Sequence, residues 1–336
     1  MKKLILILLS LGFFVQAHSQ EQKDVQDKVI IAYVTSWSKV MPDPAYMTHI
    51  NYAFGHVNNS FNGVRIDNEE RLKRICLLKE QNPALKVMLS IGGWGSGKFS
   101  EMAADETFRK AFAADCQRVV LEFGLDGIDI DWEYPTSSAA KISASPDDTE
   151  NYTLLMKDIR EAIGNNKLLT LASVANAKYV DFRAIEPVVD FVNIMSYDMA
   201  SVPRHHSPLF RSENTGRTTS AEAVIAHLEA GVPKEKLVMG MPFYGRASKE
   251  ISNFIDYNKI ELLEGYEKKW DDVAKVPYLV NAEGVFVCGY DDPRSIGIKC
   301  QYILDQGLLG AMYWDYAGDN KSGDLQKAVF EGLIKK

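Results

Sequence analysis

The stretch of this sequence most suited to chemistry is 126–133, which reads Asp-Gly-Ile-Asp-Ile-Asp-Trp-Glu. In an extended strand, successive side chains point to opposite faces, so every second residue shares a side. The isoleucines and the tryptophan then form one face, which suits a parallel strand covered by helices. If that face packs under helices, three acids point inward, toward a barrel axis or the floor of a cleft: Asp129, Asp131 and Glu133. Folding does not need such an arrangement.

Three carboxyl groups on one face of a strand are suited to acid–base catalysis. Charge coupling opposes the ionisation of all three at neutral pH, so we expect them to share protons rather than titrate independently. Glu133, at the strand end beside an acidic neighbour and aromatic residues, is expected to have a raised pKa and to protonate a leaving group. The competing interpretations are a solvated acidic edge strand and a calcium loop, although the twelve-residue EF-hand spacing is absent.

The rest of the chain alternates between runs typical of strands and runs typical of helices. Strands are predicted at 29–37, 47–55, 86–94, 126–133, 168–175, 191–198, 237–245 and 309–316. Helices are predicted at about 68–81, 99–123, 147–163, 181–186, 221–230, 293–306 and 324–334. This alternation predicts an α/β chain folded as a (β/α)8 TIM barrel rather than an open doubly wound sheet. In such a barrel the active site lies at the C-terminal strand ends, and Glu133 falls at one of them.

One segment interrupts this alternation, between the seventh and eighth predicted strands. It contains aromatic residues and a run typical of a strand, and it is too long for a simple loop. We therefore predict a small α+β insertion at 247–292 within a single catalytic barrel that spans 20–336.

The first nineteen residues are typical of a secretory signal peptide. Two lysines precede an apolar core at 4–15, and Ala17-His18-Ser19 has the small-x-small pattern of a cleavage site. The core is too short for a spanning helix, no other apolar run is long enough, and Gln20 is not a lipid-carrying cysteine. The sequence therefore predicts an exported protein, periplasmic or extracellular, without a membrane span.

The net charge limits the classes of binding partner, and the cysteine content limits the possible disulfide bonds. The formal net charge of −7 argues against nucleic acid or an anionic membrane as the main partner. In an oxidising compartment four cysteines allow three disulfide connectivities, one of which includes a Cys76–Cys116 bridge. Buried free thiols are favoured, because a core of this size needs no covalent staples. The four are Cys76, Cys116, Cys288 and Cys300.

The 126–133 stretch resembles the signature of glycoside hydrolase family 18, D-G-x-D-x-D-x-E, and similar matches extend along most of the chain. The signature's fixed positions are Asp126, Gly127, Asp129, Asp131 and Glu133. Two further segments resemble the family's S-x-G-G and M-x-Y-D motifs: Ser90-Ile91-Gly92-Gly93-Trp94 and Met195-Ser196-Tyr197-Asp198. The strand ends where the family contacts sugars are matched by Tyr33, Phe54, Arg246 and Trp314, the last resembling the tryptophan that floors the cleft. The insertion resembles a shortened form of the family's extra α+β subdomain.

The resemblance implies a retaining, substrate-assisted mechanism, in which the 2-acetamido oxygen of the substrate attacks the anomeric carbon. Glu133 would protonate the departing oxygen and later act as the base for water. Asp131 would orient the acetamido group and stabilise the oxazolinium ion, while Asp129 would share its proton with Asp131. Tyr197 would hydrogen-bond the acetamido oxygen, and Asp198 would help to hold the distorted sugar. No metal or organic cofactor is implied.

The chemistry of sugars independently favours aromatic residues at the cleft, because the apolar C–H faces of sugar rings bind flat aromatic side chains. Trp94, Trp314, Tyr33 and Phe54 lie at or near C-terminal strand ends, with barrel packing as the competing interpretation for each. Met195 is expected to line the cleft or belong to the core.

Two pairs of adjacent residues have simpler competing interpretations. Gly92 and Gly93 indicate either a bulge or tight turn, or a place where the backbone approaches a ligand closely. His205 and His206 follow the sixth strand and are not expected to bind a metal without further ligands.

These features together predict an exported chitinase that acts on chitooligosaccharides, as a monomer. The first alternative is an endo-β-N-acetylglucosaminidase that cuts the chitobiose core of N-glycans by the same chemistry. An alternative of a different class is a lectin that binds chitooligosaccharides without cutting them. The presence of Glu133, Asp131 and Tyr197 favours an enzyme over a lectin. The sequence does not distinguish endo from exo action, and it gives no measure of processivity.

Overall fold

The computed structural model describes residues 28–334 of the 336-residue chain. The predicted signal peptide, 1–19, lies outside the described residues. Within 28–334, no helix is both long enough and apolar enough to cross a membrane.

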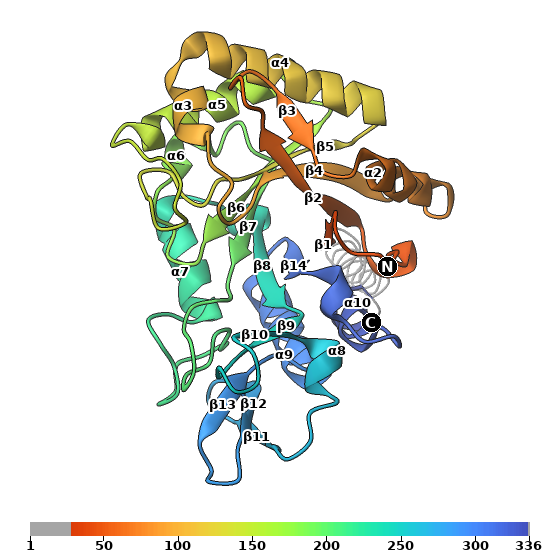
Figure 1. Cartoon of the computed structure of the whole chain (residues 1–336), viewed down its shortest axis with the longest axis vertical. Helices are drawn as coiled ribbons and strands as arrows, with labels where there is room; N and C mark the ends of the chain where they lie inside the picture. Colours follow the sequence, from red (N-terminus) through yellow and green to blue (C-terminus); the bar gives the residue numbers. More distant parts are fainter. Residues whose placement is uncertain (1–27, 335–336) are drawn as a thin grey trace, which may run out of the picture.

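Eight parallel strands form a closed barrel (Figure 1). They are hydrogen-bonded in the order β1-β14-β8-β7-β6-β5-β4-β2, and the pairing of β1 with β2 closes the ring. The prediction of a (β/α)8 TIM barrel is confirmed. The strands are β1 (Val29–Thr35), β2 (His49–Val57), β4 (Lys86–Gly92), β5 (Gly127–Asp131), β6 (Leu168–Val174), β7 (Phe191–Met195), β8 (Leu237–Pro242) and β14 (Gly310–Trp314). A short strand, β3 (Val64–Ile66), pairs antiparallel with β2.

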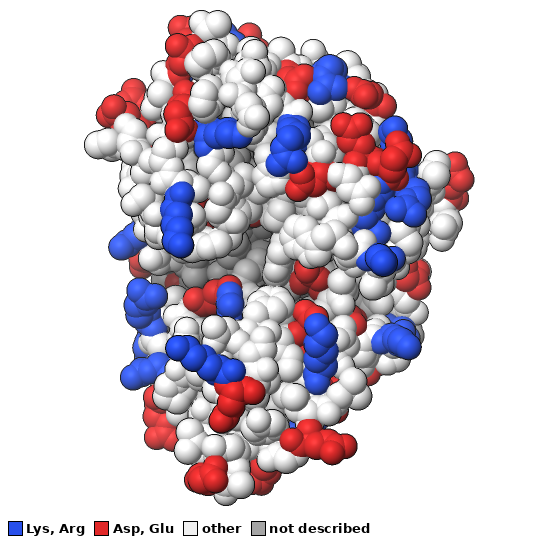
Figure 2. Space-filling view, in the orientation of Figure 1, with Lys and Arg blue, Asp and Glu red and all other residues white. Residues whose placement is uncertain are grey.

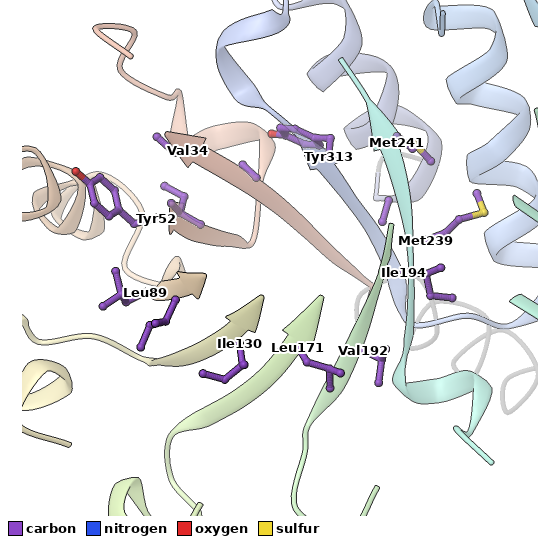
Figure 3. Close-up of a cluster of buried hydrophobic side chains, with 14 of the residues drawn as sticks. Val34, Tyr52, Leu89, Ile130, Leu171, Val192, Ile194, Met239, Met241 and Tyr313 are labelled. Atoms are coloured by element: carbon purple, nitrogen blue, oxygen red, sulfur yellow. The ribbon is translucent and has the colours of Figure 1, made fainter. Parts of the chain in front are cut away.

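The outward-facing side chains of the barrel strands pack beneath the surrounding helices (Figure 3). Val34, Ile130 and Leu171 come from three different strands, point away from the barrel axis and are buried. Just after β5, Trp132 follows the same face and stacks on Phe99, with ring centroids 5.3 Å apart. Because side chains alternate along a strand, this packing turns the opposite set, which includes the acids of β5, toward the barrel interior.

The helices that cover the barrel are α2 (Glu69–Cys76), α3 (Phe99–Ala104), α4 (Glu106–Phe123), α5 (Asp148–Ile163), α6 (Phe182–Ile185), α7 (Ser220–Ala230), α9 (Pro293–Gln306) and α10 (Asp324–Leu333). The predicted single helix at 99–123 is wrong, because the chain forms α3 and α4 there. Asp105 between them is extended, and its carboxylate accepts hydrogen bonds from the backbone N–H groups of Thr107 and Phe108. It therefore caps the start of α4 instead of continuing α3. The four cysteines are free thiols: Cys76, Cys116, Cys288 and Cys300.

A second sheet of five strands follows β8, in the order β10-β9-β13-β12-β11. Its elements are β9 (Tyr244–Ala247), β10 (Phe254–Asp256), α8 (Tyr257–Ile260), β11 (Glu267–Asp271), β12 (Val276–Val280) and β13 (Phe286–Gly289). The predicted strand at 237–245 is wrong at its end, because β8 stops at Pro242 and the chain enters this smaller sheet. Phe243 lies between the two strands and stacks on Tyr313 of β14, with ring centroids 4.2 Å apart. Arg246 consequently belongs to the smaller sheet and not to the barrel.

Candidate active site

Asp129 lies in β5, fully buried inside the barrel. Its carboxylate accepts four hydrogen bonds from other strands: from the hydroxyls of Tyr33 at 2.9 Å, Ser90 at 2.8 Å and Thr170 at 2.6 Å, and from the amide of Asn193 at 3.1 Å. Burial nevertheless raises the pKa of Asp129, and these hydrogen bonds offset the rise only in part. Asp129 thus connects β5 to four other barrel strands, β1, β4, β6 and β7, beneath the cleft.

Asp131 is the next residue on the same face of β5 and is also buried. Its Oδ1 atom has no hydrogen-bond partner among the described residues. Burial raises its pKa well above the ordinary value, and the charges of Glu133 and Asp129 raise it further. Asp131 therefore brings to the cleft an oxygen atom that no protein group satisfies, in a setting that favours protonation.

Glu133 lies two residues beyond β5 and lines the cleft. Burial raises the pKa of its carboxyl group to about 7, and the charge of Asp198 adds to the rise, while a hydrogen bond with Tyr134 opposes it. A carboxyl group that titrates near neutrality can hold a proton before a reaction and accept one afterwards. Glu133 thus has the property expected of an acid that later acts as a base.

The other two signature residues, Asp126 and Gly127, lie at the end of β5 away from the cleft. Asp126 accepts a hydrogen bond from the backbone N–H of Val87 at 2.8 Å and pairs with Lys79. Gly127 has no room for a side chain, because a Cβ atom there would lie 2.1 Å from the carbonyl oxygen of Leu168. These two residues therefore hold β5 against its neighbours β4 and β6.

Gly92 and Gly93 close the end of β4 beside β5. The N–H of Gly93 donates to the carbonyl oxygen of Asp131 at 2.9 Å. Both glycines have positive φ angles, 134° and 92°. A Cβ atom on Gly93 would lie 2.7 Å from the ring of Phe54. The two glycines therefore allow the end of β4 to approach both Asp131 and the aromatic ring of Phe54.

Tyr197 and Asp198 follow β7 and line the cleft. Burial raises the pKa of Tyr197, and three nearby carboxyl groups raise it further, so its hydroxyl keeps its proton. Asp198 accepts two hydrogen bonds from the guanidinium of Arg246 in β9, from Nε at 2.6 Å and from Nη2 at 2.5 Å. Burial acts to raise the pKa of Asp198, but the two hydrogen bonds from Arg246 hold it well below its usual range. This ion pair joins the barrel to the smaller sheet across the cleft wall.

One aromatic cluster forms part of the cleft near β1, β2 and β14. Trp314 stacks on Phe54, with ring centroids 5.5 Å apart and an interplanar angle of 22°. Tyr33 and Trp37 pack against Trp314 at 5.8 Å and 6.4 Å. The sequence predicts Trp37 only as the end of a strand, yet it is 64% exposed. The cluster presents flat apolar surface of the kind that binds sugar rings.

A second aromatic cluster follows β4 and β5. Tyr134 lies between Trp94 and Tyr179, with ring centroids 6.4 Å and 5.3 Å away. Trp94 is 64% exposed. Such exposure of large aromatic side chains points to binding rather than to barrel packing.

These residues surround one cleft of about 870 Å³, and Figure 2 shows the surface hollowed across the middle of the molecule. The predicted residues that line it are Tyr33, Phe54, Trp94, Asp131, Glu133, Met195, Tyr197, Asp198, Arg246 and Trp314. The remaining predicted residues support the strands without lining the cleft: Ser90, Gly92, Gly93, Asp126, Gly127 and Asp129.

Several cleft residues are not indicated by the sequence motifs, including Tyr134, Lys178, Tyr179, Arg217, Tyr244 and Phe254. Tyr134 directly follows the signature, and Tyr244 lies two residues before Arg246 on the same face of β9, so sequence position is a usable signal for these two. The others come from loops and from the smaller sheet, where no periodicity marks a side chain as part of the cleft.

Each of the two adjacent histidines, His205 and His206, contacts a different acidic residue. His205 Nε2 lies 3.1 Å from Asp271 Oδ2, and the ring packs edge-on against Tyr278 and Phe286. His206 Nδ1 lies 3.5 Å from Asp198 Oδ1. Across the described part of the chain, no group of three or more His, Cys, Asp or Glu side chains is placed to hold a metal ion.

Comparison with known proteins gives a consistent set of relatives. The model of the family described as Glycosyl hydrolases family 18 matches residues 29–319. Chitinase A1 of Niallia circulans is 36% identical over 302 residues, an alignment that covers 74% of this chain and 42% of that protein. Chitinase B of Serratia marcescens is 29% identical over 387 residues, covering 87% of this chain and 77% of that protein. The chain therefore spans less than half the length of Chitinase A1.

Solved structures agree with these matches. A glycoside hydrolase family 18 N-acetylglucosaminidase from Paenibacillus barengoltzii superposes with a TM-score of 0.83 at 34% identity, covering 91% of this chain and 100% of that one. The group IV chitinase of Ostrinia furnacalis superposes with a TM-score of 0.82 at 29% identity, covering 91% and 99%.

Proposed function

The chain belongs to glycosyl hydrolases family 18, and from this premise we propose that it is an exported chitinase, which hydrolyses the β-1,4 linkages between N-acetylglucosamine units. The observation that carries the proposal is the setting of Glu133. This carboxyl group, with a pKa of about 7, lines an aromatic cleft together with Asp131 and Tyr197. A general acid beside sugar-binding surfaces is what glycoside hydrolysis requires.

In the first step, Glu133 protonates the glycosidic oxygen while the carbonyl oxygen of the substrate's own acetamido group attacks the anomeric carbon. The C–O bond to the leaving sugar breaks, and a cyclic oxazolinium ion forms. Asp131 orients the acetamido N–H and balances the positive charge of the ion. The buried, protonated hydroxyl of Tyr197 donates to the acetamido oxygen and holds it in line for attack.

In the second step, Glu133, now a carboxylate, removes a proton from water, which attacks the anomeric carbon and opens the oxazolinium ring. Two inversions at one carbon give net retention. Asp129 supports both steps from beneath by sharing a proton with Asp131. The raised pKa values of these two buried aspartates favour a shared proton over two separate charges.

The two aromatic clusters support a substrate longer than one sugar. The two clusters lie at strand ends on different sides of the barrel: one contains Trp314 and Trp37, and the other contains Trp94 and Tyr134. Glu133 follows β5, the strand next to β4, which Trp94 follows. Sugars on both sides of the scissile bond would then find an aromatic face. Asp198, which is held by Arg246, would contact the sugar whose ring is distorted.

The test uses the purified protein without 1–19, incubated with N-acetylglucosamine oligomers and, separately, with a high-mannose N-glycopeptide. Mass spectrometry identifies the products. Cleaved oligomers with an intact glycopeptide are expected. The reverse pattern would make the protein an endo-β-N-acetylglucosaminidase. Binding of either ligand without cleavage would make it a lectin and contradict the proposal.

Export is tested separately from activity. We expect the full chain, expressed in a bacterial host, to yield protein outside the cytoplasm that is shortened at its N-terminus. Mass spectrometry of the exported protein gives the cleavage point. Full-length protein confined to the cytoplasm would contradict the proposed export.

A further inference from the structure

Behind the cleft wall lies an ion pair that is withdrawn entirely from water. Lys299 of α9 and Asp291, just before that helix, both have side chains with 0% exposure. The ammonium group of Lys299 donates to Asp291 Oδ2 at 2.7 Å. The other oxygen of Asp291 accepts a hydrogen bond from the hydroxyl of Ser295 at 2.7 Å. Neither charged residue lines the cleft, and the chemistry proposed above does not use them.

The two remaining protons of the ammonium group go to one residue, Ser207. Lys299 donates to the carbonyl oxygen of Ser207 and to its hydroxyl oxygen, both at 2.8 Å. The hydroxyl of Ser207 in turn donates to the carbonyl oxygen of Ser196 at 3.1 Å. Ser196 immediately precedes Tyr197, so hydrogen bonds run from the ion pair to the backbone of a proposed active-site residue.

A parallel connection runs through the residue before Ser207. The carbonyl oxygen of His206 accepts a hydrogen bond from the N–H of Met199 at 3.0 Å. The His206 ring receives the N–H of Asp198 on Nδ1 at 3.4 Å and packs against Tyr244, with ring centroids 5.3 Å apart. His206 and Ser207 therefore lie along 196–199, and Ser207 also contacts the buried ion pair.

We propose that the Lys299–Asp291 pair is a positioning device, which fixes Ser207 and through it the segment that carries Tyr197 and Asp198. The inference rests on the proposed function, because it assigns these two residues a purpose in the reaction. It makes Lys299, Asp291 and Ser207 positioning residues that never touch the substrate.

Stability alone does not call for a buried ion pair at this position. Taking an ammonium and a carboxylate out of water is costly, and replacing such a pair with apolar side chains of similar volume is often neutral or stabilising. A fully hydrogen-bonded ammonium does, however, define a geometry, because its three donors fix three acceptors at once. The proposed reaction depends on the orientation of the Tyr197 hydroxyl and the Asp198 carboxylate, so it is faster when their segment is held in one geometry.

The experiment separates position from stability with the double variant Lys299→Met/Asp291→Leu, which removes both charges together. The matched control is Arg109→Met/Asp158→Leu, which removes an ion pair of 2.5 Å between α4 and α5 that does not line the cleft. Ser207→Ala is the third variant, because it cuts the link to Ser196 while the ion pair remains. Melting temperature, kcat and KM on the N-acetylglucosamine hexamer, and a crystal structure of the double variant are measured.

We expect the folded double variant to lose about 10- to 100-fold in kcat, the loss typical of a displacement of about 1 Å, with a smaller change in KM. Ser207→Ala should lower kcat in the same direction, and the control should keep its kcat whatever its melting temperature. The crystal structure should show 196–199 displaced and the Asp198–Arg246 contact lengthened.

A folded double variant with the kcat of the unchanged protein and 196–199 in place would overturn the inference. If the double variant does not fold, an unchanged kcat for Ser207→Ala overturns it instead. If the unchanged protein cuts no substrate, the proposed function fails on its own, and the position of 196–199 in the variant structure still decides whether the pair acts as a positioning device.

Discussion

The backbone of Gly92 packs directly against the carbonyl group of Asp131: a Cβ atom on Gly92 would lie 1.9 Å from that oxygen. The two residues are register partners at the adjoining ends of β4 and β5. The carboxyl group of Asp131 therefore owes its position to the absence of a side chain on the neighbouring strand.

Replacing Gly92 by Ala is expected to separate the ends of β4 and β5 and to lower both stability and activity severely. The positive φ of 134° adds strain for any residue with a Cβ atom. The matched control is Gly265→Ala, because Gly265 also has a positive φ, 83°, but a Cβ atom there would meet no other atom within 4 Å. The control should cost about 1 kcal/mol in unfolding free energy and leave kcat unchanged. Equal effects of the two variants on kcat would contradict the role of the contact.

Glu133→Gln is expected to lower kcat by about 10²- to 10⁴-fold, the usual contribution of a general acid, because an amide cannot protonate the leaving oxygen. Binding of the N-acetylglucosamine hexamer should persist, since the side chain keeps its size. Initial rates and isothermal titration calorimetry measure the two quantities. A variant that keeps the original rate would refute the assignment of Glu133 as the acid.

Glu133 should also make stability depend on pH. Its pKa rises from 4.5 to about 7 on folding, so the folded state favours the proton. The stabilisation from this group is complete below pH 4.5 and is lost as pH rises to about 7, by at most about 3 kcal/mol. The variant Glu133→Gln removes this dependence and should gain stability relative to the unchanged protein between those pH values. Urea unfolding at the two ends of the range measures the difference, with Glu229→Gln on the exposed face of α7 as the control. A difference that stays constant with pH would contradict the raised pKa.

Asp131→Asn is expected to lower kcat by more than about tenfold, because the neutral amide cannot balance the charge of the oxazolinium ion. Asp126→Asn is a control with the same chemical change at the other end of the same strand. It should lower the melting temperature by weakening the pair with Lys79, without changing kcat. A loss below tenfold for Asp131→Asn would count against substrate assistance.

Arg246→Met should raise the pKa of Asp198 toward its ordinary value and lower kcat/KM by about tenfold, since two charge-assisted hydrogen bonds are lost. Asp198 stays ionised at neutral pH but is no longer neutralised, so its charge should raise the pKa of Glu133 further. The basic limb of the kcat/KM profile should therefore move to higher pH. A basic limb at the original pH would show that Asp198 does not act on Glu133.

Some features of the site can be predicted from short-range patterns in the sequence. The alternation of acids and apolar residues at 126–133 predicts which side chains face inward, because a strand has only two faces. The same stretch predicts the raised pKa of Glu133, since neighbouring acids in a buried setting oppose ionisation. The alternation of strand and helix runs predicts the barrel, because parallel neighbours need a crossover helix between them.

Other features depend on contacts between distant segments. The break at Asp105 arises because a short polar side chain caps α4, a competition that apolar periodicity does not reveal. The sequence pattern places Arg246 at a barrel strand end, but it lies in β9, because the chain leaves the barrel after Pro242. The sequence does not identify Tyr134 and Tyr179 as cleft residues, because their position in the cleft depends on which loops meet.

The sequence by itself therefore determined the barrel, the face that carries the acids and the family resemblance. Each of these depends on the spacing of residue types within single segments of the chain. The tertiary structure alone decided that four strands donate to Asp129, that the side chain of Asp198 meets Arg246 of the smaller sheet, and that a buried Lys299 holds the segment beside them. Each of these is a contact between residues far apart in the chain. Their formation depends on how the strands and helices pack, which no local pattern specifies.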